Sequence, residues 1–243
     1  MTASQKSVLI TGATSGIGES LVELCAQRNY RVIACGRNEL KLATLKSNFP
    51  DIDVLQFDIT DKGQIEDALG QVDSVDIVIL NAGDCEYIDD VEHFDNALFE
   101  RVINVNLISI GNMLPHIIPK VTQGGTISLM GSSVTYLPFP RAQAYGASKA
   151  GVDYLAQSLR LELQPKGLNV SLIQPGFIKT PLTDKNDFDM PFLMTSDQAA
   201  QRIFDGIEKN NKLIRFPKRF IYLMKLMSFL PEKLWTSMVL KGV

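Results

Sequence analysis

The chain has 243 residues, of which 45% are apolar and 21% charged, the composition of an ordinary soluble protein. Its net charge of −3 at pH 7 argues against a general nucleic-acid binder, because the nucleic-acid backbone is itself anionic. The three cysteines, Cys25, Cys35 and Cys85, are widely spaced and form no C-x-x-C pair. We interpret them as core residues of a protein in a reducing compartment.

We find no window of about 18 apolar residues and therefore predict no membrane-spanning helix. The first apolar run begins so close to the N-terminus that we expect no signal peptide. Together with the cysteines, this favours a cytoplasmic location. No repeat, low-complexity segment or Pro/Gly-rich linker divides the chain, so we expect one domain over residues 1–243.

Apolar strand-like runs alternate with amphipathic stretches along the chain. The expected strands are, in order, Ser7–Thr11, Arg31–Ala34, Val54–Phe57, Ile77–Leu80, Thr126–Met130, Asn169–Ile173 and Leu213–Phe216. The expected helices are Ile17–Gln27, Leu40–Asn48, Gln64–Leu69, Phe94–Met113, Ala147–Leu163 and Ser196–Lys209. Several strands are continuous Val/Ile/Leu runs, which is typical of a parallel sheet covered on both faces. The pattern predicts an α/β doubly wound parallel sheet, a Rossmann fold of about seven strands with helices on both faces.

The first strand is followed by a glycine-rich turn. Thr11–Gly18 spell T-G-A-T-S-G-I-G, so that Gly12, Gly16 and Gly18 follow the spacing G-x-x-x-G-x-G rather than G-x-G-x-x-G. Such glycines allow a tight turn and a close approach of the backbone to a pyrophosphate at the next helix N-terminus. Considered alone, the glycines are equally well explained by the steric needs of a strand-to-helix turn.

The end of the second strand bears on the choice of cofactor. Sites for NAD usually carry a carboxylate near this point, where it holds the ribose 2′-hydroxyl. Here Gly36 has no side chain and the cation of Arg37 follows, which favours the 2′-phosphate of NADP(H) over NAD(H). The alternative is that Arg37 is simply a solvated residue that opens the next helix.

Residues Tyr145–Lys149 spell Y-G-A-S-K within an expected helix. Side chains at i and i+4 share one helix face, so the Lys149 ammonium is expected near the Tyr145 phenol. A phenol has a pKa of about 10, and a nearby positive charge lowers it. We therefore predict a proton donor that works beside a bound dinucleotide.

These two motifs, and others between them, resemble the short-chain dehydrogenase/reductase family over about residues 6–181. Asp58 and Ile59 are similar to the family's residues at the adenine, Asn81-Ala82-Gly83 to the segment that braces the sheet beside the cofactor, and Pro175–Thr180 to the segment at the nicotinamide carboxamide. The cofactor-binding residues implied by this resemblance are Gly12, Thr14, Ser15, Gly16, Ile17, Gly18, Arg37, Asp58, Ile59, Asn81, Ala82, Gly83, Tyr145, Lys149, Pro175, Gly176, Ile178 and Thr180.

The resemblance also implies a catalytic set of Asn106, Ser132, Tyr145 and Lys149. In this set Tyr145 exchanges the proton, Ser132 holds the substrate oxygen, Lys149 lowers the tyrosine pKa and grips the nicotinamide ribose, and Asn106 links Lys149 to solvent through a water. From the residues alone, Asn104 competes with Asn106 and Ser133 with Ser132, and Asp58 could instead cap the following helix.

The activity implied is NADP(H)-dependent interconversion of a carbonyl and an alcohol by hydride transfer, in a homo-oligomer such as a dimer or tetramer. Two alternatives remain. A non-catalytic dinucleotide-binding or sensing protein would share the fold. An epimerase or dehydratase would resemble longer members of the family that carry an extra C-terminal substrate domain. His93 and His116 stand apart from any acidic partner in the sequence, so we predict no metal site.

Residues 181–196 are expected to form a substrate lid. Phe188, Met190, Phe192 and Met194 alternate along it without a cationic cluster, which favours an apolar carbonyl or alcohol substrate. The alternative is that these side chains pack on the protein itself.

Residues 217–243 form an apolar, basic C-terminal extension. From Lys212 to Val243 the chain has seven basic residues and one acidic residue, Glu232. On a helix, Phe220, Leu223, Met224 and Met227 share one face. Three explanations stay open: the extension covers the protein's own pocket, forms a subunit interface, or lies peripherally on an anionic membrane surface.

Overall fold

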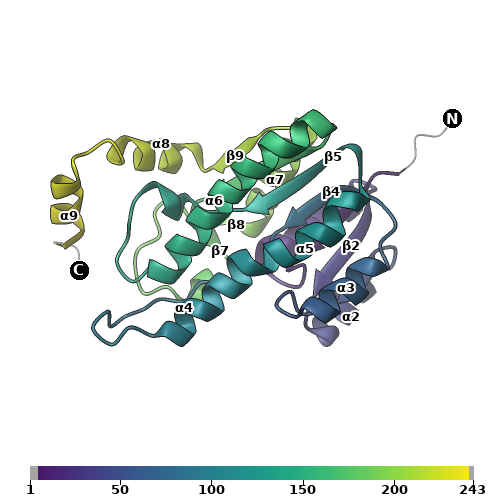
Figure 1. The fold of residues 1–243 in the computed structure, drawn as a ribbon, viewed down its shortest axis with the longest axis horizontal. Coiled ribbons are helices and arrows are strands. Elements are labelled where there is room, and N and C mark those ends of the chain that lie inside the picture. Colours follow the sequence, from purple (N-terminus) through teal and green to yellow (C-terminus); the bar gives the residue numbers. More distant parts are fainter. Residues whose placement is uncertain (1–4, 241–243) are drawn as a thin grey trace.

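The computed structural model describes residues 5–240, and its centre is a seven-stranded, fully parallel sheet (Figure 1). The strand order is β3-β2-β1-β4-β5-β6-β9, which confirms the predicted α/β fold. The strands of this sheet are β1 (Ser7–Thr11), β2 (Arg31–Gly36), β3 (Asp53–Gln56), β4 (Val75–Leu80), β5 (Val121–Met130), β6 (Asn169–Pro175) and β9 (Leu213–Phe216).

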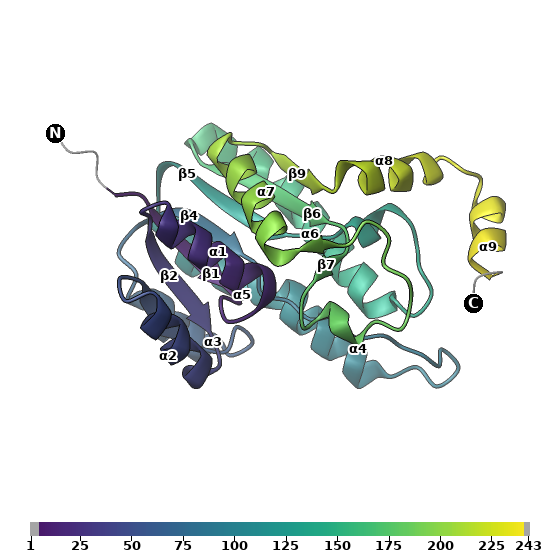
Figure 2. The ribbon, with the colours of Figure 1, turned by 180° about the vertical axis from the view of Figure 1, so that it is seen from behind.

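Helices cover both faces of the sheet (Figures 1 and 2). One face carries α1 (Gly16–Gln27), α2 (Glu39–Asn48) and α7 (Ser196–Glu208), and the other carries α3 (Lys62–Gly70), α5 (Ser109–Ile117) and α6 (Gln143–Leu163). Successive strand side chains pack on opposite faces of the sheet. Leu9 lies in the core beneath α3, α5 and α6, and Ile10 lies in the core beneath α1, α2 and α7. This two-sided burial explains why the strands are continuous apolar runs.

The order of the strands reverses between β1 and β4, which are neighbours in the sheet although β2 and β3 separate them in the chain. Val8 pairs with Ile77 and Ile10 with Ile79. A crevice forms at the carboxyl ends of the strands at such a switch point. The loops that follow β1, β2, β4, β5 and β6 therefore meet at one edge of the sheet.

The single helix predicted at Phe94–Met113 is interrupted in the structure. It consists of α4 (Asn96–Ile103), a π-helical turn at Asn104–Ile108 and α5. A side-chain Cβ at Gly151 of α6 would lie 2.6 Å from Leu107 Cδ2, so the glycine lets α6 pack closely on this turn. Interruptions of this kind occur often at functional sites, and an apolar periodicity does not reveal them.

Residues 96–120 correct the prediction that no helix is long and apolar enough to span a membrane. Within the described chain they form a helical stretch long enough, and with a mean hydropathy of 1.2 apolar enough, to cross a membrane, although we predicted none. Ile110, Met113 and Ile117 from this stretch are buried in the core that packs on the sheet. We therefore interpret it as a core helix whose apolar face accounts for its composition.

The chain after β6 contains elements that the sequence did not predict. A small parallel pair, β7 (Ile178–Lys179) and β8 (Met194–Thr195), joins the two ends of the expected lid. Two helices, α8 (Lys218–Met227) and α9 (Glu232–Leu240), extend from the body after β9 (Figure 1). Lys241 of the basic extension lies outside the described residues. The 3-10 turns are Ile118–Lys120, Ser133–Tyr136, Gln164–Lys166 and Thr183–Lys185.

Candidate functional site

A cleft of about 420 Å³ opens at the carboxyl edge of the sheet, within the size range of small-molecule sites. Seventeen of the eighteen predicted cofactor-binding residues line it. They are Gly12, Thr14, Ser15, Gly16, Ile17, Arg37, Asp58, Ile59, Asn81, Ala82, Gly83, Tyr145, Lys149, Pro175, Gly176, Ile178 and Thr180. The exception is Gly18, which is buried behind the turn.

The glycine turn after β1 has the geometry that we expected from its sequence. Gly12 and Gly16 adopt positive φ angles of 65° and 55°, which side chains disfavour. A Cβ at Gly18 would lie 2.0 Å from the Gly12 carbonyl oxygen, so Gly18 allows α1 to pack on the turn instead of contacting a cofactor. The Ser15 side chain makes no capping bond to α1, which leaves the N–H groups of the first turn available for an anion.

Asn81 fastens the end of β4 to the end of β1. Its side-chain amide donates to the carbonyl oxygens of Thr11 at 3.0 Å and Gly12 at 3.3 Å. The Thr11 hydroxyl in turn accepts from the backbone N–H groups of Asn81 at 3.0 Å and Ala82 at 3.1 Å. These bonds brace the two strands that border the switch point, the position that the resemblance implied for this segment.

The ends of β2 and β3 bring Arg37 and Asp58 to the same end of the cleft. A Cβ at Gly36 would lie 2.9 Å from Thr14 Cγ2, so this position has little room for the carboxylate of an NAD site. Burial by itself would raise the pKa of Asp58, but hydrogen bonds from Thr60 and the Arg37 charge hold it below its usual value. Asp58 does not cap α3, because Asp61 does so by accepting from Gln64 N.

Three of the four predicted catalytic side chains meet at the ends of β5 and α6. Tyr145 and Lys149 lie one turn apart on α6, with Lys149 Nζ 5.7 Å from the centre of the Tyr145 ring. Lys149 is buried and donates to the Met130 carbonyl oxygen at 2.9 Å. Ser132 begins the turn after β5 and lies close enough to Tyr145 to lower its pKa. Ser133 is also buried, but it is not among the described residues that shift the pKa of Tyr145.

The pKa of Tyr145 differs from our prediction. Desolvation of the hydroxyl and the neighbouring Cys85 raise it above its ordinary value, and this outweighs the lowering by Ser132. Burial likewise lowers the pKa of Lys149 to about 8. Both shifts favour the neutral forms, because a buried charge loses its hydration.

Asn106 lies in the π-helical turn and is fully buried. Its side-chain nitrogen donates to the Asp84 carbonyl oxygen at 2.8 Å and to Ser148 Oγ at 2.9 Å, while its oxygen accepts from Asp84 N at 2.7 Å. A Cβ at Gly83 would lie 3.0 Å from this oxygen and 3.3 Å from Lys149 Nζ. Asn106 thus fixes the loop after β4 beside Lys149, whereas its neighbour Asn104 is only half-buried. The water relay remains a prediction.

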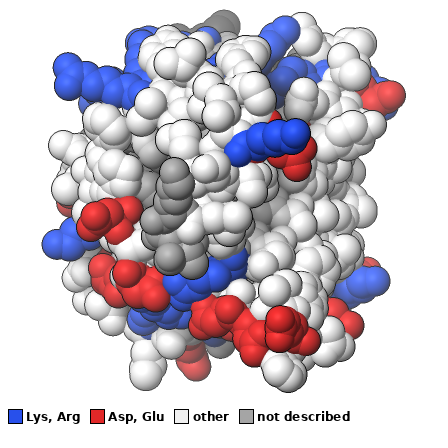
Figure 3. Space-filling view, turned by 90° about the vertical axis from the view of Figure 1, so that its left-hand side faces the viewer, with Lys and Arg blue, Asp and Glu red and all other residues white. Residues whose placement is uncertain are grey.

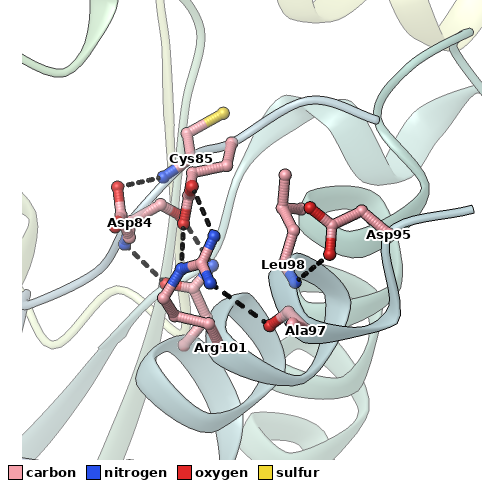
Figure 4. A network of polar contacts seen from close by, with 8 residues as sticks. Asp84, Cys85, Asp95, Ala97, Leu98 and Arg101 are labelled. Atoms are coloured by element: carbon pink, nitrogen blue, oxygen red, sulfur yellow. Dashed lines mark hydrogen bonds and ion pairs between the residues drawn. The ribbon is translucent and has the colours of Figure 1, made fainter. Parts of the chain in front are cut away.

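Figure 4 shows how the loop after β4 is held against α4. Arg101 of α4 donates to both Glu86 oxygens, at 2.8 and 2.9 Å, and the Asp84 side chain accepts from Cys85 N at 2.8 Å. Cys25 and Cys35 are buried as predicted, but Cys85 is only half-buried in this loop. Its thiol contributes to raising the pKa values of Tyr145 and Lys149. The proximity of Cys85 to the site could not be predicted from the sequence, because it arises only in the fold.

Aromatic side chains border the site on the lid side. Phe177 contacts Phe188 of the lid and Phe220 of α8, with ring centres 6.0 and 5.5 Å apart. Phe188 and Phe192 remain 41% and 45% exposed, so these lid side chains are only partly packed on the protein. Tyr87 completes the cluster, with its ring centre 6.0 Å from that of Phe188, and no motif in the sequence indicated this residue.

Arg141 ties the lid to the loop after β4. It donates to Asp89 at 2.6 Å and to Asp187 at 2.9 Å, and its guanidinium lies 5.3 Å from the centre of the Tyr87 ring. This role of Arg141 could not be predicted from the sequence, because its partners are far apart in the chain.

Among residues 5–240, no three His, Cys, Asp or Glu side chains are grouped so that they could hold a metal ion. His93 does have an acidic partner, Asp90, at 2.7 Å, but both side chains are exposed at the surface.

The comparisons with known proteins agree with this geometry. The short chain dehydrogenase family matches residues 6–190. An uncharacterized oxidoreductase of Myxococcus xanthus is 29% identical over 96% of both chains. A 3-oxoacyl-[acyl-carrier-protein] reductase of Rickettsia typhi is 32% identical over 74% of this chain and 76% of its own.

Solved structures share the fold. A short-chain dehydrogenase from Sphingobium yanoikuyae in complex with NADPH is 27% identical, superposes with a TM-score of 0.79, and is covered over 93% of this chain and 96% of its own. A Burkholderia phymatum enzyme in complex with NAD has a TM-score of 0.81 at 19% identity, over 91% and 92% of the two chains. The chain belongs to the short chain dehydrogenase family of NAD(P)-dependent oxidoreductases.

Proposed function

We propose that the protein is an NADP(H)-dependent oxidoreductase that interconverts a carbonyl and an alcohol, with Tyr145 as proton donor and acceptor. The observation that carries the proposal is that Tyr145 and Lys149 line the same cleft as the glycine turn, with Ser132 beside Tyr145. The residues present suit a dinucleotide, because the turn leaves a cradle in which Cβ atoms at Gly12 and Gly16 would collide with the protein.

Each residue of this group has a distinct task. The nicotinamide supplies the hydride chemistry. Tyr145 gives its proton to the carbonyl oxygen in reduction and takes it back in oxidation, and the Ser132 hydroxyl holds that oxygen by a hydrogen bond. Lys149 stabilises the tyrosinate during the transfer and binds the ribose hydroxyls. Asn106 keeps the backbone at Asp84 in place beside Lys149.

The preference for NADP(H) rests on Arg37. This cation follows Gly36 at the cleft, and the crowding of Gly36 against Thr14 disfavours a carboxylate there. A 2′-phosphate beside Arg37 gains an ion pair with charge-assisted hydrogen bonds, whereas the uncharged 2′-hydroxyl of NAD(H) gains no ion pair.

We propose an apolar substrate, because the lid side of the site carries Phe177, Phe188 and Tyr87. The 3-oxoacyl-[acyl-carrier-protein] reductase relative supports the carbonyl class without identifying the compound. A homo-oligomer remains our prediction. The α6 helix offers exposed Tyr154 and Leu161 as contact residues, and light scattering of the purified protein measures its mass.

The alternative, a dinucleotide-binding protein without catalysis, explains the cleft but gives no reason for Tyr145, Lys149 and Ser132 to be assembled there. The test is the oxidation of NADPH and of NADH with ketones and aldehydes graded by lipophilicity. We expect turnover with NADPH that rises with substrate lipophilicity. Tight NADPH binding without turnover on any carbonyl or alcohol would favour the alternative.

A further inference from the structure

The C-terminal arm, defined as residues 218–240 with α8 and α9, is held in a fixed position on the body of the protein. Phe220 and Met224 of α8 and Trp235 of α9 are buried in one cluster with Leu137. Trp235 Nε1 also donates to the Pro138 carbonyl oxygen at 2.9 Å. The inner side of the arm therefore packs on the body of the protein.

The outer side of the arm is apolar and uncovered. Of the 19 large apolar side chains that are exposed in residues 5–240, eight belong to the arm. Leu226 is 69% and Phe229 is 85% exposed, and Leu223, which we expected on the same face as Phe220 and Met224, is 43% exposed. The eight residues are Tyr222, Leu223, Leu226, Phe229, Leu230, Leu234, Met238 and Leu240. An apolar surface of this extent is unusual for a surface that contacts only water.

Cations lie among these apolar side chains. At 100° per residue, Arg219 falls on the same side of α8 as Leu223 and Leu226, and Lys218 and Lys225 flank that side. Within the described chain, none of the three takes part in an ion pair.

On the end of the molecule that Figure 3 shows, the upper half is mostly uncharged and carries several separate basic side chains, whereas most acidic groups lie in the lower half, where a basic group lies among them. In Figure 1, α8 lies at the top of this end and α9 lies below it.

We propose that the outer face of the C-terminal arm docks on an anionic lipid surface. Anionic headgroups neutralise Lys218, Arg219 and Lys225, whose aliphatic stems lie along the apolar side chains. A second copy of the chain is the less favourable occupant. A two-fold interface places equivalent patches against each other, and the single acidic residue of the arm, Glu232, cannot compensate the cations of both copies.

Docking in this orientation also sets the position of the cleft. Phe220, on the inner side of α8, contacts Phe177 at 5.5 Å and Phe192 of the lid at 6.2 Å between ring centres. In this orientation, the α8 helix lies between the lipid and Phe177, which is the chain neighbour of the cleft residues Gly176 and Ile178. The lipid contact itself does not depend on the proposed activity.

The test is flotation of the full chain with phosphatidylcholine vesicles that contain or lack phosphatidylglycerol. We expect flotation with the anionic vesicles and its loss at high salt. Leu226→Glu, and separately the triple change Lys218→Gln, Arg219→Gln and Lys225→Gln, should each weaken partitioning by about tenfold or more, because they remove apolar insertion or surface attraction.

Matched controls place the same changes elsewhere. Leu40→Glu alters an apolar side chain that is 80% exposed, and Lys41→Gln, Lys62→Gln and Arg202→Gln remove three exposed cations. These variants should float like the parent, and the circular dichroism and NADPH affinity of all variants should be unchanged. Equal binding to neutral vesicles, undiminished binding of Leu226→Glu, or no flotation overturns the proposal. No flotation together with a lower solution mass of Leu226→Glu would assign the face to a second copy.

Discussion

Lys149 Nζ lies 5.7 Å from the centre of the Tyr145 ring, yet the pKa of Tyr145 stays above its ordinary value because desolvation of the hydroxyl dominates. The pair therefore holds a protonated phenol beside an ammonium that is itself buried. A proton donor needs this arrangement in the reductive direction. The ammonium then stabilises the negative charge that develops on the phenol oxygen as the proton leaves.

Replacing the phenol tests its role directly. Tyr145→Phe should lower kcat by about 10²–10⁴-fold and leave NADPH binding nearly unchanged, because only the proton donor is removed. Ketone-dependent NADPH oxidation measures the first effect and NADPH fluorescence titration the second. The control is Tyr154→Phe on the same helix, whose side chain is 77% exposed. Activity of Tyr145→Phe within a few fold of the parent would show that another group is the acid.

Arg37 should determine the choice between the two dinucleotides. We expect the parent to bind NADP(H) at least about tenfold more tightly than NAD(H), which corresponds to about 1.4 kcal/mol. Arg37→Ala should remove most of this difference by weakening NADP(H) binding alone, while Lys41→Ala, an exposed cation on the following helix, should retain it. The measurement is a pair of dissociation constants for each variant. Equal constants in the parent would refute the preference.

The buried positive charge of Lys149 should lower the free energy of unfolding. Burial lowers its pKa from 10.5 to about 8, so between these pH values the unfolded chain binds more protons than the folded one and stability rises with pH. Lys149→Met should therefore be about 2 kcal/mol more stable near pH 7, after the loss of the bond to Met130, and inactive.

Urea unfolding measures this difference, which should shrink as the pH rises from about 8 and vanish well above 10.5, where Lys149 is neutral in both states. The exposed Lys41→Met provides the control. Equal urea midpoints of the parent and Lys149→Met near pH 7 would show that burial of the ammonium does not lower the stability of the fold.

Gly18 should matter through packing. In Gly18→Ala the new Cβ would lie 2.0 Å from the Gly12 carbonyl oxygen, which forces α1 away from the turn and costs about 1–3 kcal/mol. NADPH affinity should fall with it. Gly111→Ala is the matched helical control, since nothing lies within 4 Å of its added Cβ, and it should be neutral or slightly stabilising. Normal NADPH affinity in Gly18→Ala would contradict the packing role.

Arg141 should act on the substrate side alone. Arg141→Ala removes the bonds to Asp89 and Asp187 that join the loop after β4 to the lid. We expect a higher KM for the carbonyl substrate with little change in NADPH affinity. Because these side chains are partly exposed, the increase in KM should be modest. High salt should bring the KM of the parent closer to that of Arg141→Ala. An unchanged KM would show that the bonds of Arg141 to the lid do not affect substrate binding.

The parallel sheet and the outline of the candidate cofactor site could be predicted from the amino-acid sequence alone. The strands Ser7–Thr11 and Leu213–Phe216 agree with the structure to the residue, because two-sided burial imposes continuous apolar runs that local composition reveals. The glycine turn and the Tyr145–Lys149 spacing are equally local, since both depend on residues a few positions apart.

Which side chains face each other across the fold could not be predicted before the fold was known. The π-helical turn that buries Asn106, the approach of Cys85 to Tyr145, and the Arg141 bonds join segments that are remote in sequence. The pKa of Tyr145 also depended on the fold, because helix spacing indicates the nearby charge of Lys149 but not the desolvation that outweighs it. For the same reason, the periodicity of α8 outlined an apolar face, but the contacts of Phe220 and Trp235 determined which side of the arm is buried.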